Sequence, residues 1–147
     1  MNLHCKNLLK SLTDIGFESA GSFSLEGADL ILKPLKYGEQ KELLYCFVEN
    51  NVPVYVGKTV KSLKERMRQY ERGDRSQKTN HRINKQIVEA LKQDNKIEIY
   101  VLTFPEQHTH LGFRLNLAAG LEDSLITHVK DTLEGCNEES WNIAGTT

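Results

Sequence analysis

Apolar positions along the 147-residue chain follow two spacings, which together predict a domain of mixed helices and strands. Near-helical spacing predicts helices over residues 2–13, 62–70, about 80–91 and 117–133, with Gly135 ending the last one. Compact apolar runs predict a hairpin, with strands over 43–48 and 52–56 joined by a turn at 49–51. A β-branched run predicts another strand over 96–103, and a short strand is expected over 29–33.

The segments between these elements are rich in glycine, serine or charge and predict loops. Gly16, Gly21 and Gly27 predict an irregular segment before residue 29, and loops are expected over 71–80 and 104–114. The order of elements predicts an α+β fold, with a small three-stranded antiparallel sheet flanked by helices. We divide the chain into an N-terminal extension (1–38), with a helix and a possible short strand, and a main domain (39–147).

Composition narrows the class of protein. A hydrophobic fraction of 39% is enough for a single core, and no apolar run is long enough to span a membrane. The first residues lack the pattern of a signal peptide. Three scattered cysteines (Cys5, Cys46 and Cys136) form no C-x-x-C pair. We therefore expect no disulfide framework and a cytoplasmic protein.

The net charge of −1 hides an uneven distribution. Between Lys58 and Lys85, ten lysines and arginines face three carboxylates, which gives this segment +7 and the remainder −8. Such a stripe is typical of a surface that follows a phosphate backbone, although a solvated helix face with a basic loop fits the charge equally well. Besides Lys58 and Arg66, the candidate nucleic-acid-binding residues are Lys61, Lys64, Arg68, Arg72, Arg75, Lys78, Arg82 and Lys85.

Glu122 is an unusual residue for its position. It lies on a helix row with Ala118 and Ile126, beside the row of apolar residues that predicts the buried face: Leu117, Leu121, Leu125, Val129 and Leu133. A carboxylate next to a core loses hydration unless a cation compensates it. That cation is either a metal ion or a lysine or arginine at the edge of the core.

A second group of candidates combines phenols with basic side chains. Tyr45 and Tyr55 lie on adjoining strands of the predicted hairpin, so their side chains can meet on one face of the sheet. Arg66 and Tyr70 are four residues apart on a helix and share its surface, and Lys58 follows the second strand. Singly, each tyrosine is typical of packing. Jointly with Glu122, these groups can serve phosphodiester chemistry, because arginine and a metal stabilise charge on phosphorus while a phenol or water transfers a proton.

The order of these motifs resembles the GIY-YIG nuclease superfamily. Leu43-Leu44-Tyr45 matches its first motif, and Tyr55-Val56-Gly57 matches the second. Arg66 with Tyr70 matches the helix motif, Glu122 the downstream glutamate, and Asn142 the final asparagine. The resemblance covers about residues 40–143 and favours the branch with a phage endonuclease II and compact restriction endonucleases. The first motif has leucines for glycine and isoleucine, and Tyr70 stands where many members have histidine.

The resemblance implies an endonuclease that hydrolyses DNA with Mg²⁺, or Mn²⁺ in its place, and is sequence-specific or has a phage or defence role. In that scheme Tyr45 and Tyr55, helped by Lys58, position or deprotonate the water. Arg66 clamps the phosphate and Tyr70 assists proton transfer. Glu122 binds the metal, and Asn142 orients a phosphate or the glutamate. The alternative is a non-catalytic nucleic-acid-binding module of the same fold, which would be expected to have lost Arg66 or Glu122.

One such site cuts one strand, so cleavage of a duplex implies a homodimer or larger homo-oligomer. The N-terminal apolar stripe of Leu3, Leu8, Leu9 and Leu12 lies outside the resemblance. It is either a surface for that assembly or a face that packs on the chain's own sheet.

Overall fold

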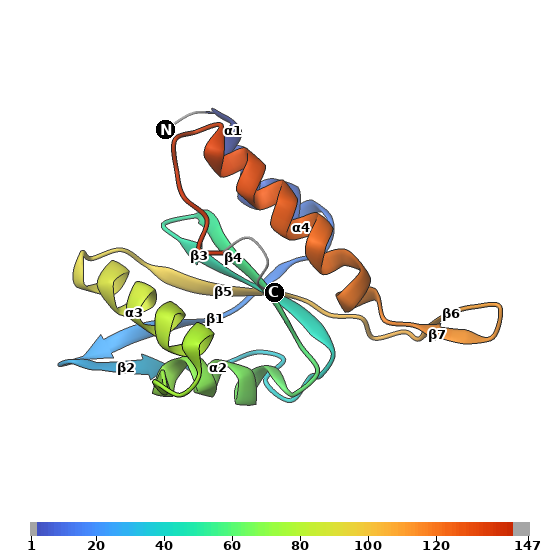
Figure 1. Cartoon of the computed structure of the whole chain (residues 1–147), viewed down its shortest axis with the longest axis horizontal. Helices are drawn as coiled ribbons and strands as arrows, with labels where there is room; N and C mark the ends of the chain where they lie inside the picture. The colour runs from blue at the N-terminus through green and yellow to red at the C-terminus, as the bar shows by residue number, and fades with distance from the viewer. Residues whose placement is uncertain (1–2, 143–147) are drawn as a thin grey trace.

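A computed structural model describes residues 3–142 as a five-stranded sheet with helices on both sides (Figure 1). Helices α2 and α3 cover one face, and α1 and α4 lie side by side over the other (Figure 1). The helices are α1 (Leu3–Asp14), α2 (Leu63–Arg72), α3 (Lys78–Lys92) and α4 (Leu117–Glu134). The strands are β1 (Glu18–Glu26), β2 (Asp29–Leu32), β3 (Leu43–Glu49), β4 (Val52–Thr59), β5 (Ile97–Leu102), β6 (His108–His110) and β7 (Phe113–Leu115).

The main sheet is antiparallel and has the strand order β2-β1-β5-β3-β4. The predicted hairpin is confirmed as β3 and β4, with Tyr45 opposite Gly57 and Phe47 opposite Tyr55. The α+β class is confirmed, but the prediction of three strands is wrong. Strands β1 and β2 extend the sheet beyond β5, so the N-terminal segment contributes to the same sheet as the rest of the chain.

Strand β1 replaces the irregular segment that its glycines and serines predicted. Its burial alternates only in part, with Ala20 and Phe23 facing the core. Gly21 lies where the pairing with β5 shifts register, and a Cβ there would come within 2.7 Å of the Leu35 side chain. The glycine therefore serves close packing inside a strand, a use that its sequence context does not distinguish from a loop.

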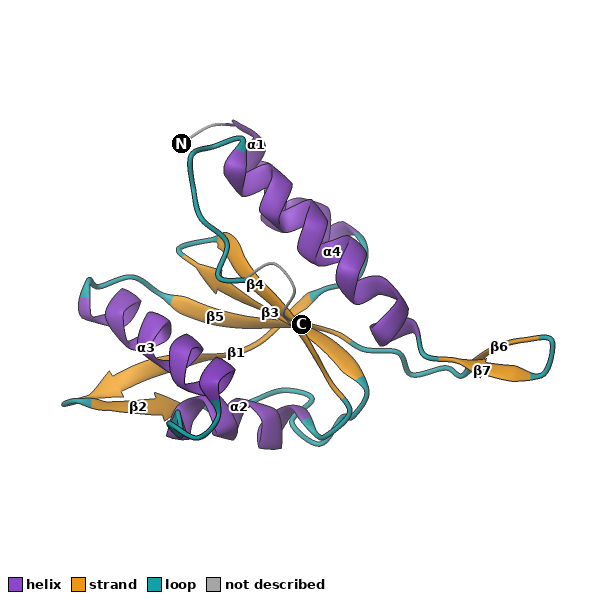
Figure 2. Cartoon of the chain, viewed as in Figure 1, coloured by secondary structure: helices purple, strands orange, loops and turns teal. Residues whose placement is uncertain are grey.

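The expected loop over 104–114 contains a second, two-stranded sheet formed by β6 and β7, which extends away from the body of the protein (Figure 2). All six residues of the two strands are exposed, and Leu111 and Phe113 near the turn are 84% and 76% exposed. An ion pair between Arg114 and Glu42 links the hairpin to the segment before β3.

Helix α1 packs on α4 and on β4, and buries Leu8 and Leu12 in the common core. Of the two interpretations of the N-terminal stripe, the structure therefore shows packing within the chain.

The structure also corrects the expectation for the cysteines: Cys5 of α1 and Cys136 just after α4 form a disulfide, while Cys46 is free and buried. The two partners are 131 residues apart, so only the packing of the helices reveals the pair. Among the described residues, no helix has the length and apolar character that crossing a membrane requires.

Candidate active site

Strand β4 is at the edge of the main sheet, and the predicted site residues gather around it. On the face covered by α2 and α3, Tyr55 stacks on Phe47 with ring centroids 5.6 Å apart. Tyr45 lies 6.3 Å from Tyr55, and Tyr70 from α2 meets both rings edge-on. The three phenols are 0–3% exposed and form one aromatic cluster.

Arg66 binds the hydroxyls of this cluster. Its Nε donates to Tyr45 Oη at 3.1 Å and its Nη2 to Tyr70 Oη at 2.7 Å, so one edge of the guanidinium holds two phenols. The two hydroxyls are 2.6 Å apart. Tyr55 is the least engaged phenol, since its hydroxyl takes part only in a 3.5 Å hydrogen bond from Tyr70.

The remaining corner of the Arg66 guanidinium is held by two residues that the sequence analysis did not place in the site. Nη1 donates to Gln69 Oε1 at 2.6 Å and to Asn80 Oδ1 at 2.7 Å. Four of the five N–H groups of an arginine are thus engaged, and one on Nη2 is left for a substrate. Asn80 lies on α3, and only the packing of α3 against α2 brings it to Arg66.

Burial raises the pKa of Tyr45, and it raises the pKa of Tyr70 well above the ordinary value for a phenol. The positive charge of Arg66 opposes the shift at both residues without cancelling it. Both phenols are therefore neutral near pH 7. They can hold a hydrogen-bond network in place, but neither is a ready proton acceptor.

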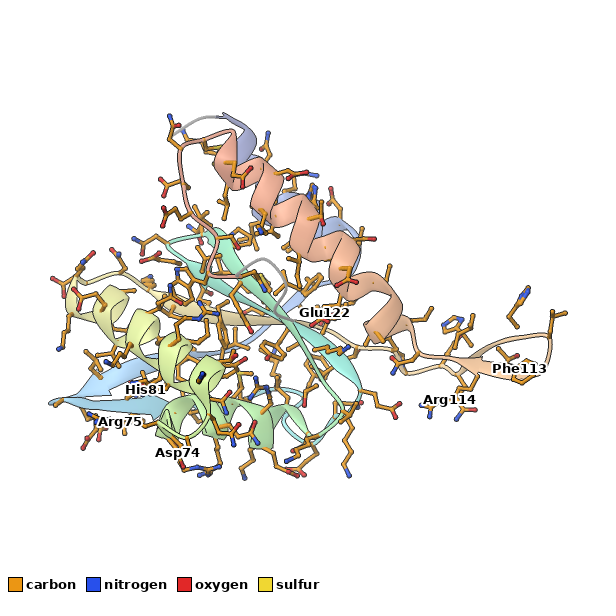
Figure 3. All side chains as sticks on the ribbon, in the orientation of Figure 1. Asp74, Arg75, His81, Phe113, Arg114 and Glu122 are labelled. Atoms are coloured by element: carbon orange, nitrogen blue, oxygen red, sulfur yellow. A yellow bond between two sulfur atoms is a disulfide. The ribbon has the colours of Figure 1, made fainter. Side chains whose placement is uncertain are left out.

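Glu122 and Lys58 form a second part of the site. Lys58 Nζ is 3.5 Å from Glu122 Oε1, and Glu122 itself is only 1% exposed (Figure 3). Its other carboxylate oxygen, Oε2, is buried and has no hydrogen-bond partner within residues 3–142. Burial raises the pKa of Glu122, and the nearby Lys58 works in the opposite direction.

Glu122 lies within the buried stripe of α4, whereas the leucine row was expected to form it. Ala118, Glu122 and Leu125 are buried, and Leu121 is 38% exposed. Four-residue steps overshoot a helical turn by about 40°, so a row that is buried at the end of a long helix rotates outward at its start.

The unpartnered oxygen of Glu122 fits the binding of a divalent metal. Mg²⁺ is often held by one or two carboxylates, with water and substrate oxygens as its other ligands. No cluster of three or more histidine, cysteine or acidic side chains suited to a metal occurs among residues 3–142. Glu122 would therefore be the main protein ligand of such an ion.

Asn142 lies at the outer edge of β4, and both its amide oxygen and its amide nitrogen bond to that strand. Its Oδ1 accepts from the N–H of Val56 and its Nδ2 donates to the carbonyl of Val56, both at 2.9 Å. Trp141 N–H donates to the carbonyl of Val54 at 2.7 Å. The asparagine therefore holds the backbone between Tyr55 and Gly57, and touches neither Glu122 nor the phenols.

The predicted DNA-binding cations are spread over α2, α3 and the turn between them, where Figure 3 shows Arg75, with Lys61 in the loop before α2. All eight except Arg82 are exposed. Arg82 donates to the carbonyl of Trp141 at 2.7 Å and so secures the C-terminal segment. Lys64 and Arg68 line a hollow beside β2, whereas Lys61, Arg72 and Lys78 line another between α2 and α3.

This α+β fold, with an arginine–tyrosine network beside a buried glutamate, defines the chain as a nuclease-like domain. A family model, the GIY-YIG catalytic domain, matches residues 41–133, and the chain belongs to this family. Membership indicates endonuclease activity.

Two solved structures are similar in fold. A mutant of bacteriophage T4 EndoII has a TM-score of 0.65 and 23% identity, over 92% of this chain and 98% of the other. The restriction endonuclease HPY188I in complex with product DNA has a TM-score of 0.53 and 16% identity, over 92% and 84%. No curated protein matches in sequence.

Gly57 provides a test of the aromatic cluster. A Cβ at this position would lie 2.5 Å from both Cζ and Oη of Tyr45, whose ring is buried and bound to Arg66. We expect Gly57→Ala to lower the free energy of unfolding by about 1–3 kcal/mol, because the ring must move in a packed core. Urea denaturation measures the change.

Gly120→Ala is the matched control. A Cβ at Gly120 meets no atom within 4 Å, and the residue lies inside α4, where alanine is favoured by roughly 0.5–1 kcal/mol. A Gly57→Ala protein as stable as the wild type would mean that the Tyr45 ring is not fixed against the strand.

Proposed function

We propose that this chain is a Mg²⁺-dependent endonuclease that hydrolyses phosphodiester bonds of DNA. The observation that carries the proposal is the buried Glu122 carboxylate, which keeps one oxygen without a partner although Lys58 is beside it. A buried carboxylate in this state is costly unless a ligand completes it. DNA is the proposed substrate because the family is one of nucleases, one structural neighbour was solved with product DNA, and exposed cations cover α2 and α3.

A metal ion at Glu122 would supply a Lewis acid that polarises a phosphoryl oxygen. The protein supplies the other requirements. The free N–H on Arg66 Nη2 can bind an oxygen of the phosphate as charge grows on it. Tyr55 has the hydroxyl with the fewest partners, and we assign it the contact with the attacking water. Tyr45 and Tyr70 keep the guanidinium in place, while Asn142 fixes the backbone on which Tyr55 stands.

The proposal places the activity in the class of restriction enzymes or phage nucleases, in keeping with the two similar folds. A non-catalytic DNA-binding module is the other candidate. It is disfavoured by the retention of both Arg66 and Glu122, because a module that only binds has no need of a buried, incompletely paired carboxylate.

The substitution Glu122→Gln tests the metal site directly. It keeps the size of the side chain and removes its charge, so cleavage of duplex DNA in Mg²⁺ should fall by at least about 100-fold. DNA affinity, measured by fluorescence anisotropy in EDTA, should be unchanged or higher. Asp123→Asn is the control, because it makes the same change at an exposed neighbour and should leave cleavage intact. Full cleavage by Glu122→Gln would favour the binding module or another metal ligand.

We expect the hydroxyl of Tyr55 to matter for the reaction and the hydroxyl of Tyr70 to matter for stability. Tyr55→Phe removes one weakly bonded hydroxyl, so turnover should fall by about 100-fold with little change in unfolding free energy. Tyr70→Phe removes a hydroxyl with two short hydrogen bonds and should cost about 1–3 kcal/mol of stability. Single-turnover cleavage and urea denaturation distinguish them. Equal loss of stability in both variants would contradict the assignment of Tyr55 to the water.

We further propose that the active form on duplex DNA is a homodimer or a larger homo-oligomer. One Glu122 and one Arg66 per chain make one site, and each strand of a duplex needs its own cut. Light scattering on the Glu122→Gln protein with a DNA duplex should give the mass of the duplex plus at least two 16.8 kDa chains. This assembly would be excluded if the variant binds the duplex as a monomer and the wild-type protein produces only nicked duplex.

A further inference from the structure

A polar cavity of about 590 Å³ lies between α2 and the start of α3. Four cationic side chains line it, together with a single carboxylate, Asp74, so its formal charge is +3. The cations are Lys61, Arg66, Arg72 and Lys78. The cavity borders the corner of the Arg66 guanidinium that faces Gln69 and Asn80, and not the edge that holds the phenols.

The positive charge of this cavity is not neutralised within the described part of the chain. Lys61, Arg72 and Lys78 form no salt bridge and donate no side-chain hydrogen bond to any residue in the range 3–142. Asp74 lies in the turn between α2 and α3 (Figure 3), and its Oδ1 accepts 2.9 Å hydrogen bonds from the backbone and hydroxyl of Ser76. Asp74 keeps its negative charge, because these hydrogen bonds and, to a lesser extent, the nearby Arg72 lower its pKa, but one carboxylate against four cations leaves the cavity with its net positive charge.

Hydrogen-bond donors point to the same kind of ligand. Asn80 is 8% exposed and gives its Oδ1 to Arg66, but its Nδ2 finds no acceptor among the residues that the structure describes. Asn80 is also the third residue of α3, whose first backbone N–H groups have no partner inside the helix. Gln77, which precedes them, makes no side-chain cap. A buried amide, free main-chain donors and three unpaired cations together suit a tetrahedral anion.

We propose that this cavity binds a backbone phosphate of the DNA other than the one that is cut. The inference rests on the proposed function and deepens it. Because Arg66 holds the phenols with one edge and borders the cavity with its other corner, a phosphate bound here places the substrate strand at a fixed distance from the reacting centre. Lys64 and Arg68 do not share this site, since they line the separate hollow on the other side of α2 with Glu39 and Glu71.

The test uses the full-length Glu122→Gln protein, labelled with ¹⁵N, and two probes: a 12-base-pair DNA duplex in EDTA, and inorganic phosphate. The amide signals of Lys78, Thr79 and Asn80 should shift saturably with the duplex. Inorganic phosphate should compete for the same site, so its presence should raise the duplex concentration at which the shift is half complete. Lys78→Gln should weaken duplex binding roughly 10-fold and reduce the slope of log affinity against log salt by about 1. Lys92→Gln is the control, because Lys92 is an exposed lysine in the last turn of α3, outside the predicted DNA-binding set and the cavity, and its loss should leave the duplex-induced shifts of these three amides unchanged.

Three results would overturn the phosphate site. The three amides could stay unshifted with the duplex, they could respond only to inorganic phosphate, or Lys92→Gln could alter their shifts as much as Lys78→Gln. Cleavage by the wild type is measured separately. If the protein cleaves DNA but these amides do not shift, the phosphate site is refuted and the proposed function stands. If the amides shift but the wild type does not cleave DNA with any divalent metal, the phosphate site stands and the proposed activity is refuted.

Discussion

The hydrogen bonds along the outer edge of β4 are the constraint on which the rest of the site depends. An edge strand presents backbone groups that must find partners when they are covered. Here the segment Ser140–Asn142 supplies them, at the carbonyl of Val54 and at both polar groups of Val56. This segment is in turn held by Arg82 of α3. The strand that carries Tyr55 and Lys58 is thereby fixed on both sides, by β3 within the sheet and by residues 86 positions later in the chain.

The half-buried Arg66 and the buried Glu122 have very different hydrogen-bond surroundings. Arg66 is almost saturated with hydrogen bonds, to two phenols and two side-chain carbonyls, so it is held in one orientation before any substrate arrives. Glu122 has Lys58 at 3.5 Å from one oxygen, and its other oxygen has no partner among the described residues. The first arrangement is typical of a preorganised binding group, and the second is typical of a group that awaits a ligand.

The parts of this molecule with strong periodicity were predictable from sequence. The β3–β4 hairpin and the four helices follow from apolar spacing, and the match to family motifs singled out Tyr45, Tyr55, Arg66 and Glu122. Strand β1 was missed because Gly21 serves packing against Leu35, and β6 and β7 because their exposed residues leave no burial pattern. Asn80 and the Cys5–Cys136 bond depend on which helices become neighbours, which local sequence patterns do not show. Gln69 lies three residues after Arg66 on α2, so helical spacing could have placed it beside the arginine.

The bond between Cys5 and Cys136 turns most of the chain into a covalent ring. The turn at Leu111 and Gly112 lies within that ring, and Leu111 is 84% exposed, so a protease can reach it. A single cut there would open the backbone without releasing a fragment, because both new ends remain tied through the sulfurs. Strands β3 and β4 would stay covalently attached to α4, and Tyr55 would remain on the same molecule as Glu122. In an oxidising setting, the protein can thus lose the continuity of its backbone at the hairpin and still keep the two halves of its site together.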